Sequence, residues 1–423
     1  MNNMRGCTTS NQISCGLDFG TSNSVISLTD KATCKEIFSY SANSILYFPE
    51  GNDFDCFVGK EAQEKYVEEG MRGRLLKSVK TLLRQDNFLY TWIGGRKVTP
   101  DQLVTYIISH LKAKAEEFCG KEITEVVLGR PAVFSEDPQK EKIAVDRLLL
   151  AARNAGFRDI TLQLEPIAAA FAYESTLDHP QNVLVADFGG GTSDFTIIHL
   201  SPEKVGLSNR EEDILGHDGV YIGGDLFDSE IMWHKITPHL GRGVMYKDYN
   251  KEVAIPTTLF WDLRNWEKSF LLKNSKNRRM MDKFYVFSGN NARIDNVRRL
   301  IDHNYVYSLF KIIEQAKIEL SKQPESEINF DKLAVEIHDT FRYEEFEEMI
   351  TKHMSDIERC ILQLLHTVGY DASQIDSVFL TGGSSLALPV QKLLGSIFGE
   401  GKIQQGNTFN SVAQGLSLSG GEK

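Results

Sequence analysis

One sequence pattern occurs twice in this chain, and each copy reads as a β-hairpin closed by a glycine turn. The copies are residues 16–26 (GLDFGTSNSVI) and residues 186–197 (ADFGGGTSDFTI). Each runs from an apolar strand through an aspartate, a tight glycine turn and two hydroxyl side chains into a second apolar strand. A single glycine-rich turn is weak information, because most such turns only connect strands. Two matched copies predict an internal duplication, with two hairpins that face each other.

The chemistry of both copies suits a phosphate chain with its metal ion. Glycine tolerates positive φ, so such turns direct backbone N–H groups inward and form an anion-binding concavity. Carboxylates supply the hard oxygens that Mg²⁺ and its waters prefer. The pattern therefore predicts a clamp for ATP between the hairpins. Its hydroxyl donors are Thr21, Ser22, Thr192 and Ser193, and its carboxylates are Asp18, Asp187 and Asp194.

Composition narrows the class of protein. The chain has 423 residues, 41% of them hydrophobic, which suffices for two or more domains with substantial cores. Its 47 Lys and Arg against 58 Asp and Glu give a net charge of −11, so the chain lacks the excess of basic residues typical of proteins that bind nucleic acid or an anionic membrane. The six cysteines lack paired spacing, and no apolar run approaches the ~18 residues of a membrane span. We therefore expect a reduced, cytoplasmic protein with no nucleic-acid or membrane partner.

The order of segments predicts two lobes. The first spans residues 13–177, and the second spans residues 182–415 and opens with the second hairpin. A less regular subdomain is inserted at about residues 241–296, and residues 416–423 form a short tail. Alternating strands and helices, with a matching hairpin at the start of each lobe, predict an α/β fold with a central cleft.

Further motifs, taken with the hairpins, resemble one family. They are LEPIAAAFAY (164–173), IGG (222–224), EQAK (314–317) and TGGS (381–384). As a set they are similar to the ATPase domain of the seventy-kilodalton heat-shock chaperones, which implies the actin-like ATPase fold with ribonuclease H-like duplicated lobes. The resemblance runs from about residue 13 to residue 415. Residues 151–159 most resemble the short YegD-type members, which lack a substrate-binding domain.

The resemblance implies roles around the phosphates. Asp18 and Asp187 would hold Mg²⁺ through water, and Thr192 would lie near the γ-phosphate. Lys80 matches the family's catalytic lysine, whose charge offsets that of the transferring phosphoryl group and orients the attacking water. Without the resemblance, an isolated lysine reads as a surface residue. The phosphate-binding residues would be Gly20, Thr21, Ser22, Asn23, Gly189, Gly190 and Gly191.

Two further carboxylates have both a structural and a functional interpretation. Glu165 precedes Pro166 at the start of an Ala-rich helix, where the helix dipole favours a carboxylate and proline is tolerated. Capping alone would explain Glu165. In the family pattern, however, Glu165 and Asp194 match the pair that positions the attacking water and the metal shell, so we expect both to act in catalysis.

The base site departs from the family pattern. Glu314 and Lys317 would reach a ribose, although a surface i,i+3 pair is the alternative. The family stacks an arginine on each adenine face, and Ile318 and Leu386 stand at those positions here. Each lost cation–π contact removes ~0.5–2 kcal/mol, unless aliphatic packing on the ring compensates. Asn410 replaces a family aspartate near the base. The remaining nucleotide-binding candidates are Gly223, Gly224, Ser321, Gly382, Gly383 and Ser384.

The resemblance implies an ATP-binding, slowly hydrolysing, Mg-dependent chaperone-like ATPase that binds ATP or ADP and opens and closes its cleft. Only residues 416–423 follow the fold, so we expect no peptide-binding domain and a cochaperone or client-binding partner protein. Two alternatives remain open. A small-molecule kinase of the actin superfamily needs a base aspartate that faces an acceptor pocket. A filament or scaffold protein would assemble in response to nucleotide.

Overall fold

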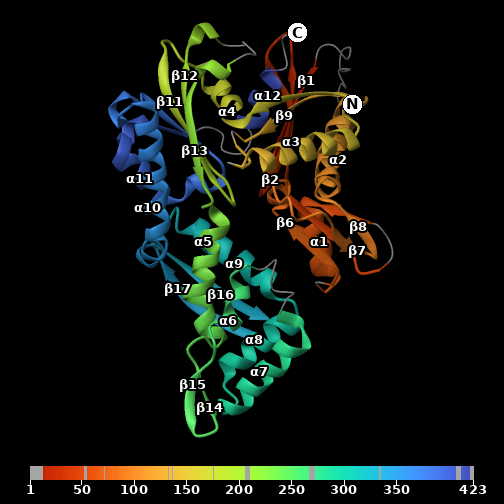
Figure 1. Cartoon of the computed structure of the whole chain (residues 1–423), viewed down its shortest axis with the longest axis vertical. Coiled ribbons are helices and arrows are strands. Elements are labelled where there is room, and N and C mark those ends of the chain that lie inside the picture. The colour runs from red at the N-terminus through yellow and green to blue at the C-terminus, as the bar shows by residue number, and fades with distance from the viewer. Residues whose placement is uncertain are drawn as a thin grey trace, which may run out of the picture.

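Two five-stranded sheets form the centres of two lobes that lie side by side in the computed structural model (Figure 1). The first sheet belongs to the N-terminal part of the chain and the second to the C-terminal part. The structure describes residues 13–51, 55–70, 72–131, 133–135, 137–174, 176–204, 210–265, 272–332, 335–405 and 411–419.

The first sheet has the strand order β10-β9-β1-β2-β3. β1 pairs antiparallel with β2 through the first glycine turn and parallel with β9 on its other side. Parallel neighbours need crossover connections, which α2 and α3 supply while packing against each other. The bounds are β1 (Ile13–Phe19), β2 (Asn23–Asp30), β3 (Lys35–Asn43), β9 (Glu125–Arg130), β10 (Asp159–Leu164), α2 (Pro100–Cys119) and α3 (Pro138–Asn154).

The second sheet repeats this arrangement in the order β13-β12-β11-β18-β19. Here β11 pairs antiparallel with β12 through the second glycine turn and parallel with β18. The repeated topology confirms the duplicated α/β fold predicted from the paired hairpins. The bounds are β11 (Gln181–Phe188), β12 (Ser193–Leu200), β13 (Ile214–Val220), β18 (Ser377–Thr381), β19 (Ile403–Gln405), α10 (Tyr343–Val368) and α11 (Leu388–Phe398).

Two helices, α4 (Glu165–Glu174) and α12 (Ser411–Ser419), pack against each other at the junction of the lobes (Figure 1). α12 also lies on β1, β2 and β9 of the first sheet. A Cβ on Gly415 would lie 1.8 Å from the Ala168 carbonyl oxygen, so this helix contact requires glycine.

The course of α12 differs from the tail expected at residues 416–423. The chain is helical through residue 419, because Val412, Ala413 and Leu416 form an apolar stripe that is buried between the first sheet and α4. The last described helix therefore packs against the sheet of the first lobe. The lobe boundaries themselves remain a prediction.

Smaller elements extend each lobe beyond its central sheet (Figure 1). In the first lobe they are β4 (Ile45–Phe48), β5 (Phe57–Val58), α1 (Gly59–Glu68), β6 (Arg74–Lys77), β7 (Thr91–Ile93) and β8 (Arg96–Val98). In the second they are α5 (Gly224–Ile231), β14 (Met245–Asp248), β15 (Lys251–Ala254), α6 (Thr258–Trp261), α7 (Ser275–Phe287), α8 (Ala292–Asp302), α9 (Val306–Glu319), β16 (Glu325–Lys332) and β17 (Val335–Arg342). The insert expected at about residues 241–296 thus starts near the β14–β15 hairpin and ends within α8.

Across the described ranges, no helix combines the length and apolar character needed to cross a membrane.

Candidate functional site

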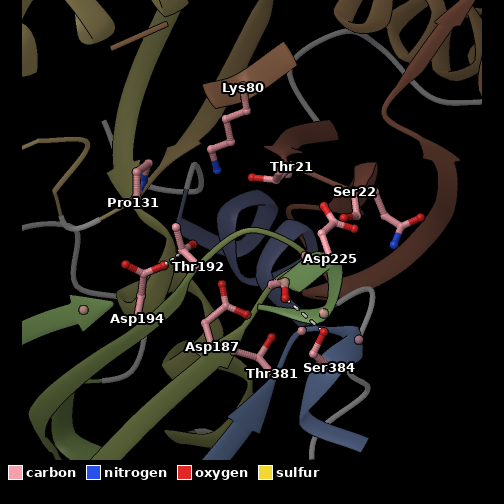
Figure 2. A pocket seen from close by; sticks show the side chains of 18 of the residues that line it. Thr21, Ser22, Lys80, Pro131, Asp187, Thr192, Asp194, Asp225, Thr381 and Ser384 are labelled. Carbon is pink, nitrogen blue, oxygen red and sulfur yellow. Dashed lines mark hydrogen bonds between the residues drawn. The ribbon is translucent and has the colours of Figure 1, made fainter. Parts of the chain in front are cut away.

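A cavity of about 720 Å³ lies between the lobes, within the size range of small-molecule sites. Both glycine turns contribute to its walls, and Figure 2 shows Lys80, Thr21 and Ser22 on one side and Asp187, Thr192 and Asp194 on the other. The structure brings nearly all the predicted residues together here: Asp18, Gly20, Thr21, Ser22, Asn23, Lys80, Glu165, Asp187, Gly189, Gly190, Thr192, Asp194, Gly224, Glu314, Lys317, Ser321, Gly382, Gly383 and Ser384. Gly191 and Gly223 do not line the cavity, and neither does Ser193, whose buried hydroxyl donates to the Ile222 carbonyl oxygen at 2.7 Å instead.

The two glycine turns touch each other. A Cβ on Gly190 would lie 1.9 Å from Ser22 Oγ, and a Cβ on Gly191 would lie 3.5 Å from Thr21 Cγ2. A larger residue at position 190 would therefore force the Ser22 hydroxyl to move, and the reason is the close approach of the first lobe rather than the backbone angles of Gly190. The lobes are closed on each other at the turns.

The second turn is also held by α5. Gly189 and Gly190 accept hydrogen bonds at their carbonyls from the backbone N–H groups of Gly224 (3.1 Å) and Asp225 (2.8 Å). A Cβ on Gly223 would lie 2.5 Å from the Gly190 carbonyl oxygen. The Gly223–Gly224 pair therefore supports the turn from behind, which explains why Gly223 lies beside the cavity.

Four carboxylates gather around a single lysine on the floor of the cavity. Lys80 Nζ lies 2.8 Å from Glu165 Oε1. Burial, with the charge of Glu165, raises the pKa of Asp18 to about 7. Burial also raises the pKa of Asp194 to about 6, although the Thr192 hydroxyl donates to its Oδ2 at 2.8 Å. Burial and the charge of Asp194 raise the pKa of Asp187 well above its ordinary value.

This donor set fits a hydrated Mg²⁺ ion. Burial and mutual repulsion raise the pKa of Asp18 and of Asp187 even though Lys80 opposes the shift, so a divalent cation would further stabilise their ionised forms. In the described part of the chain, no three His, Cys, Asp or Glu side chains converge closely enough to hold an ion directly. Magnesium usually keeps several of its waters, so Asp18 and Asp187 are suited to hold it through them.

The predicted base site lies around α9 and the turn after β18. Ile318 and Leu386 line the cavity with side chains that are 46% and 40% exposed. Ser384 Oγ donates to the Gly189 carbonyl oxygen at 2.9 Å, which joins this turn to the second glycine turn. Gly382 has φ +77°, and a Cβ there would lie 2.3 Å from the Phe188 carbonyl oxygen. Asn410 lies outside the described residues.

Glu314 and Lys317 do not form the i,i+3 surface pair that was the alternative to a ribose site. Lys317 instead pairs with Asp228 of α5 at 2.7 Å, and Glu314 pairs with Lys311 at 3.0 Å. Both predicted residues line the cavity.

Sequence reasoning missed two contacts between the lobes. Lys77 of β6 pairs with Asp225 of α5 at 2.5 Å, and the Arg84 guanidinium lies 4.1 Å from the centre of the Tyr221 ring. No local sequence pattern predicts either contact, because Lys77 ends strand β6 and meets α5 only where the two lobes dock.

Comparisons with known proteins fit this geometry. A family model described as Hsp70 protein matches residues 51–242 and 284–421. This chain belongs to the Hsp70 family. The actin-like fold of the family's ATPase domain is the one observed here, as expected.

Two relatives are chaperone proteins DnaK. That of Halobacterium salinarum is 26% identical over 421 residues, covering 96% of this chain and 55% of the relative. That of Mycoplasmopsis agalactiae is 25% identical over 420 residues, covering 96% and 58%. The chain therefore spans a little over half the length of these relatives.

Proposed function

We propose that this protein is a chaperone-type ATPase of the Hsp70 family that binds Mg-ATP between its lobes and hydrolyses it slowly to ADP and phosphate. The observation that carries this proposal is the meeting of two glycine turns, one from each lobe, over Lys80 and four carboxylates. Hsp70 membership and similarity to proteins named as chaperones support the same reading.

In this proposal the glycine turns bind the phosphates. Their backbone N–H groups, with the hydroxyls of Thr21 and Ser22, are suited to donate to phosphate oxygens. Bound Mg²⁺ would neutralise phosphate charge and favour phosphoryl transfer. Asp18 and Asp187 would hold and orient its waters, which requires both carboxylates to be ionised.

Three side chains would act on the attacking water. Lys80 is held by Glu165, and the carboxylates Glu165 and Asp18 more than offset the effect of burial and raise the pKa of Lys80 above its ordinary value. Its ammonium therefore stays charged beside the transferring phosphoryl group. Asp194, with a pKa of about 6, is ionised at neutral pH yet more basic than an ordinary carboxylate. Asp194 is therefore suited to accept a proton from water, and the Thr192 hydroxyl orients the Asp194 carboxylate.

The proposed nucleotide is adenine-based but held differently from the family pattern. Ile318 and Leu386 present partly exposed aliphatic surface to the cavity, where the purine ring would pack between them.

A separate cochaperone or client-binding protein would respond to opening and closing of the lobes. Such a partner must bind the open and closed states with different affinities, because a ligand shifts an equilibrium between two states only in that way.

Calorimetry and thermal unfolding with ATP, ADP and GTP, each with Mg²⁺ or with a chelator, test this proposal. A ligand that binds only the folded state raises its stability by mass action. We expect Mg-ATP and Mg-ADP to raise the melting temperature and the chelator to reduce the effect. Absence of binding heat and of any shift at millimolar Mg-ATP would contradict the proposal.

A further inference from the structure

Three cationic side chains follow one another along the segment that leads from β6 through the turn at residues 79–82. They are Lys77, Lys80 and Arg84, and the first two are paired with carboxylates. Arg84 forms no ion pair with any carboxylate of the described residues. Its guanidinium lines the cavity instead. A guanidinium that lines this cavity without a carboxylate partner among the described residues points to an anionic ligand.

The Arg84 guanidinium lies over an aromatic ring of the opposite lobe. Its Cζ lies 4.1 Å from the centre of the Tyr221 ring, and Tyr221 stands between β13 and α5. A guanidinium that stacks by its face keeps its N–H donors free along its edge. These donors match the oxygens of a phosphate in a two-point contact.

The stack lies at the Asp194 end of the cavity. Tyr221 follows Gly219 by two residues, and a Cβ on Gly219 would lie 2.8 Å from Asp194 Oδ1. The charge of Arg84 is also close enough to lower the pKa of Asp194, partly opposing burial. Ile318 and Leu386, which flank the proposed base site, belong to α9 and the turn after β18. A triphosphate that runs from the base site across the glycine turns would bring its last phosphoryl group toward Asp194 and Arg84.

We propose that Arg84 binds the terminal phosphoryl group of a nucleoside triphosphate, and that its stack on Tyr221 makes this contact depend on closure of the two lobes. The inference rests on the proposed nucleotide function and adds a residue that tells a triphosphate from a diphosphate. A guanidinium at this position also stabilises charge on the transferring phosphoryl oxygens. Arg84 is thus a second cation, beside Lys80, for the transferring group.

The test compares the affinities of the β,γ-imido analogue of ATP and of ADP, measured by calorimetry with Mg²⁺. We expect Arg84→Gln to weaken binding of the analogue about ten- to a hundredfold, as for a lost hydrogen-bonded charge, while ADP affinity stays within about twofold. Tyr221→Ala should weaken the analogue less, in the same direction, and Tyr221→Phe should leave it unchanged because the ring face remains. Arg279→Gln removes the same charge from the exposed surface of α7 and serves as the control.

Equal losses for both nucleotides would overturn the inference, because Arg84 would then only hold the lobes together. Unchanged affinity for both would overturn it as well. If Arg84→Gln does not fold, Arg84→Lys, which keeps the charge but not the two-point contact, should show the same selective loss. Failure of the unaltered protein to bind either nucleotide would refute the proposed function itself, so the two failures are distinguishable.

Discussion

Lys77 Nζ and Asp225 Oδ1 lie 2.5 Å apart, and this ion pair joins the two lobes across the cleft. The Lys77 side chain is only 17% exposed, whereas that of Asp225 is 36% exposed. Asp225 also donates its backbone N–H to the second glycine turn, so the pair links lobe closure to the phosphate site. In the proposed function, release of nucleotide requires the lobes to separate, and this pair would oppose that separation.

We therefore expect Lys77→Met to speed the release of ADP. The pair is partly exposed to solvent, so its loss should lower the barrier by about 1 kcal/mol, which is roughly a fivefold faster dissociation. Stopped-flow displacement of a fluorescent ADP measures this rate. Lys114→Met removes a lysine from an exposed pair with Glu117 on α2 and should leave the rate unchanged. An unchanged rate in Lys77→Met would show that the pair does not limit opening.

Lys80 and Asp194 are expected to act on the chemical step. Lys80→Ala and Asp194→Asn should slow single-turnover hydrolysis by about a hundredfold or more, since a positioned acid–base group alone contributes about 10²–10⁴-fold. ATP affinity should change far less, because groups that act mainly in the transition state affect turnover more than binding. Rapid-quench measurement of bound ATP follows both quantities. Equal losses of ATP affinity and of turnover would indicate that both residues have only a structural role.

The two glycine hairpins could be predicted from sequence because each depends on a short local motif, whereas the roles expected around Lys80 came from the family resemblance and remain predictions. A glycine turn between two apolar strands specifies its own geometry, and two copies specify the duplication. The contact between Lys77 and Asp225 was not accessible in this way. These residues are far apart in the chain and meet only because the two lobes dock. Local periodicity carries no information about such docking.

The helix at the end of the described chain illustrates the same limit. Val412, Ala413 and Leu416 predict an apolar helical face, but the sequence does not say which lobe covers it. Gly16 of β1 allows α12 to pack closely on the first lobe, because a Cβ at this position would lie 2.3 Å from the Ser417 backbone nitrogen. Its role in packing α12 becomes visible only when both segments are placed in space.

The buried carboxylates should make the nucleotide-free protein less stable as pH rises. An aspartate in the unfolded chain has a pKa of about 3.9, and the folded-state pKa is about 7 for Asp18 and about 6 for Asp194. Between these values the folded state binds more protons than the unfolded state, so the free energy of unfolding falls as pH rises from about 4 to about 7.

Asp18→Asn removes one of these titrating groups. At pH 8, without Mg²⁺ or nucleotide, we expect this variant to be more stable than the unaltered protein by on the order of 1 kcal/mol. Its free energy of unfolding should also fall less between about pH 4, near the pKa of an unfolded aspartate, and about pH 7, near the pKa of Asp18 in the folded state. Urea unfolding across this pH range measures the effect. Mg-ATP affinity should fall in the same variant. A variant with the same pH dependence as the unaltered protein would contradict burial of an ionised Asp18.

Installing the family's arginines should tighten ATP binding. In Ile318→Arg with Leu386→Arg, each guanidinium is placed to stack on the purine, and two such contacts correspond to roughly a ten- to several-hundredfold gain in affinity. Calorimetry with ATP and GTP measures the gain and its base preference. Equal or weaker ATP binding would place the base elsewhere or show that the aliphatic pair already packs it well.

Gly190 provides the sharpest test of the closed arrangement of the glycine turns. Its added Cβ would lie 1.9 Å from Ser22 Oγ but 3.2 Å from Ser22 Cβ, so the clash is almost entirely with one hydroxyl oxygen. Gly190→Ala should therefore displace the Ser22 hydroxyl or hold the lobes apart, and should weaken Mg-ATP binding by roughly ten- to a hundredfold.

Ser22→Ala in the same chain removes the clashing oxygen and should restore part of the affinity, although it also removes a phosphate donor. Ser22→Ala alone should weaken binding by about tenfold or less, the usual cost of one hydrogen bond. The double-mutant cycle isolates the interaction between these positions, and its coupling energy should favour the double variant. Additive losses would mean that the two turns do not meet in the nucleotide-bound state, and that the closed form seen here is not the one that binds ATP.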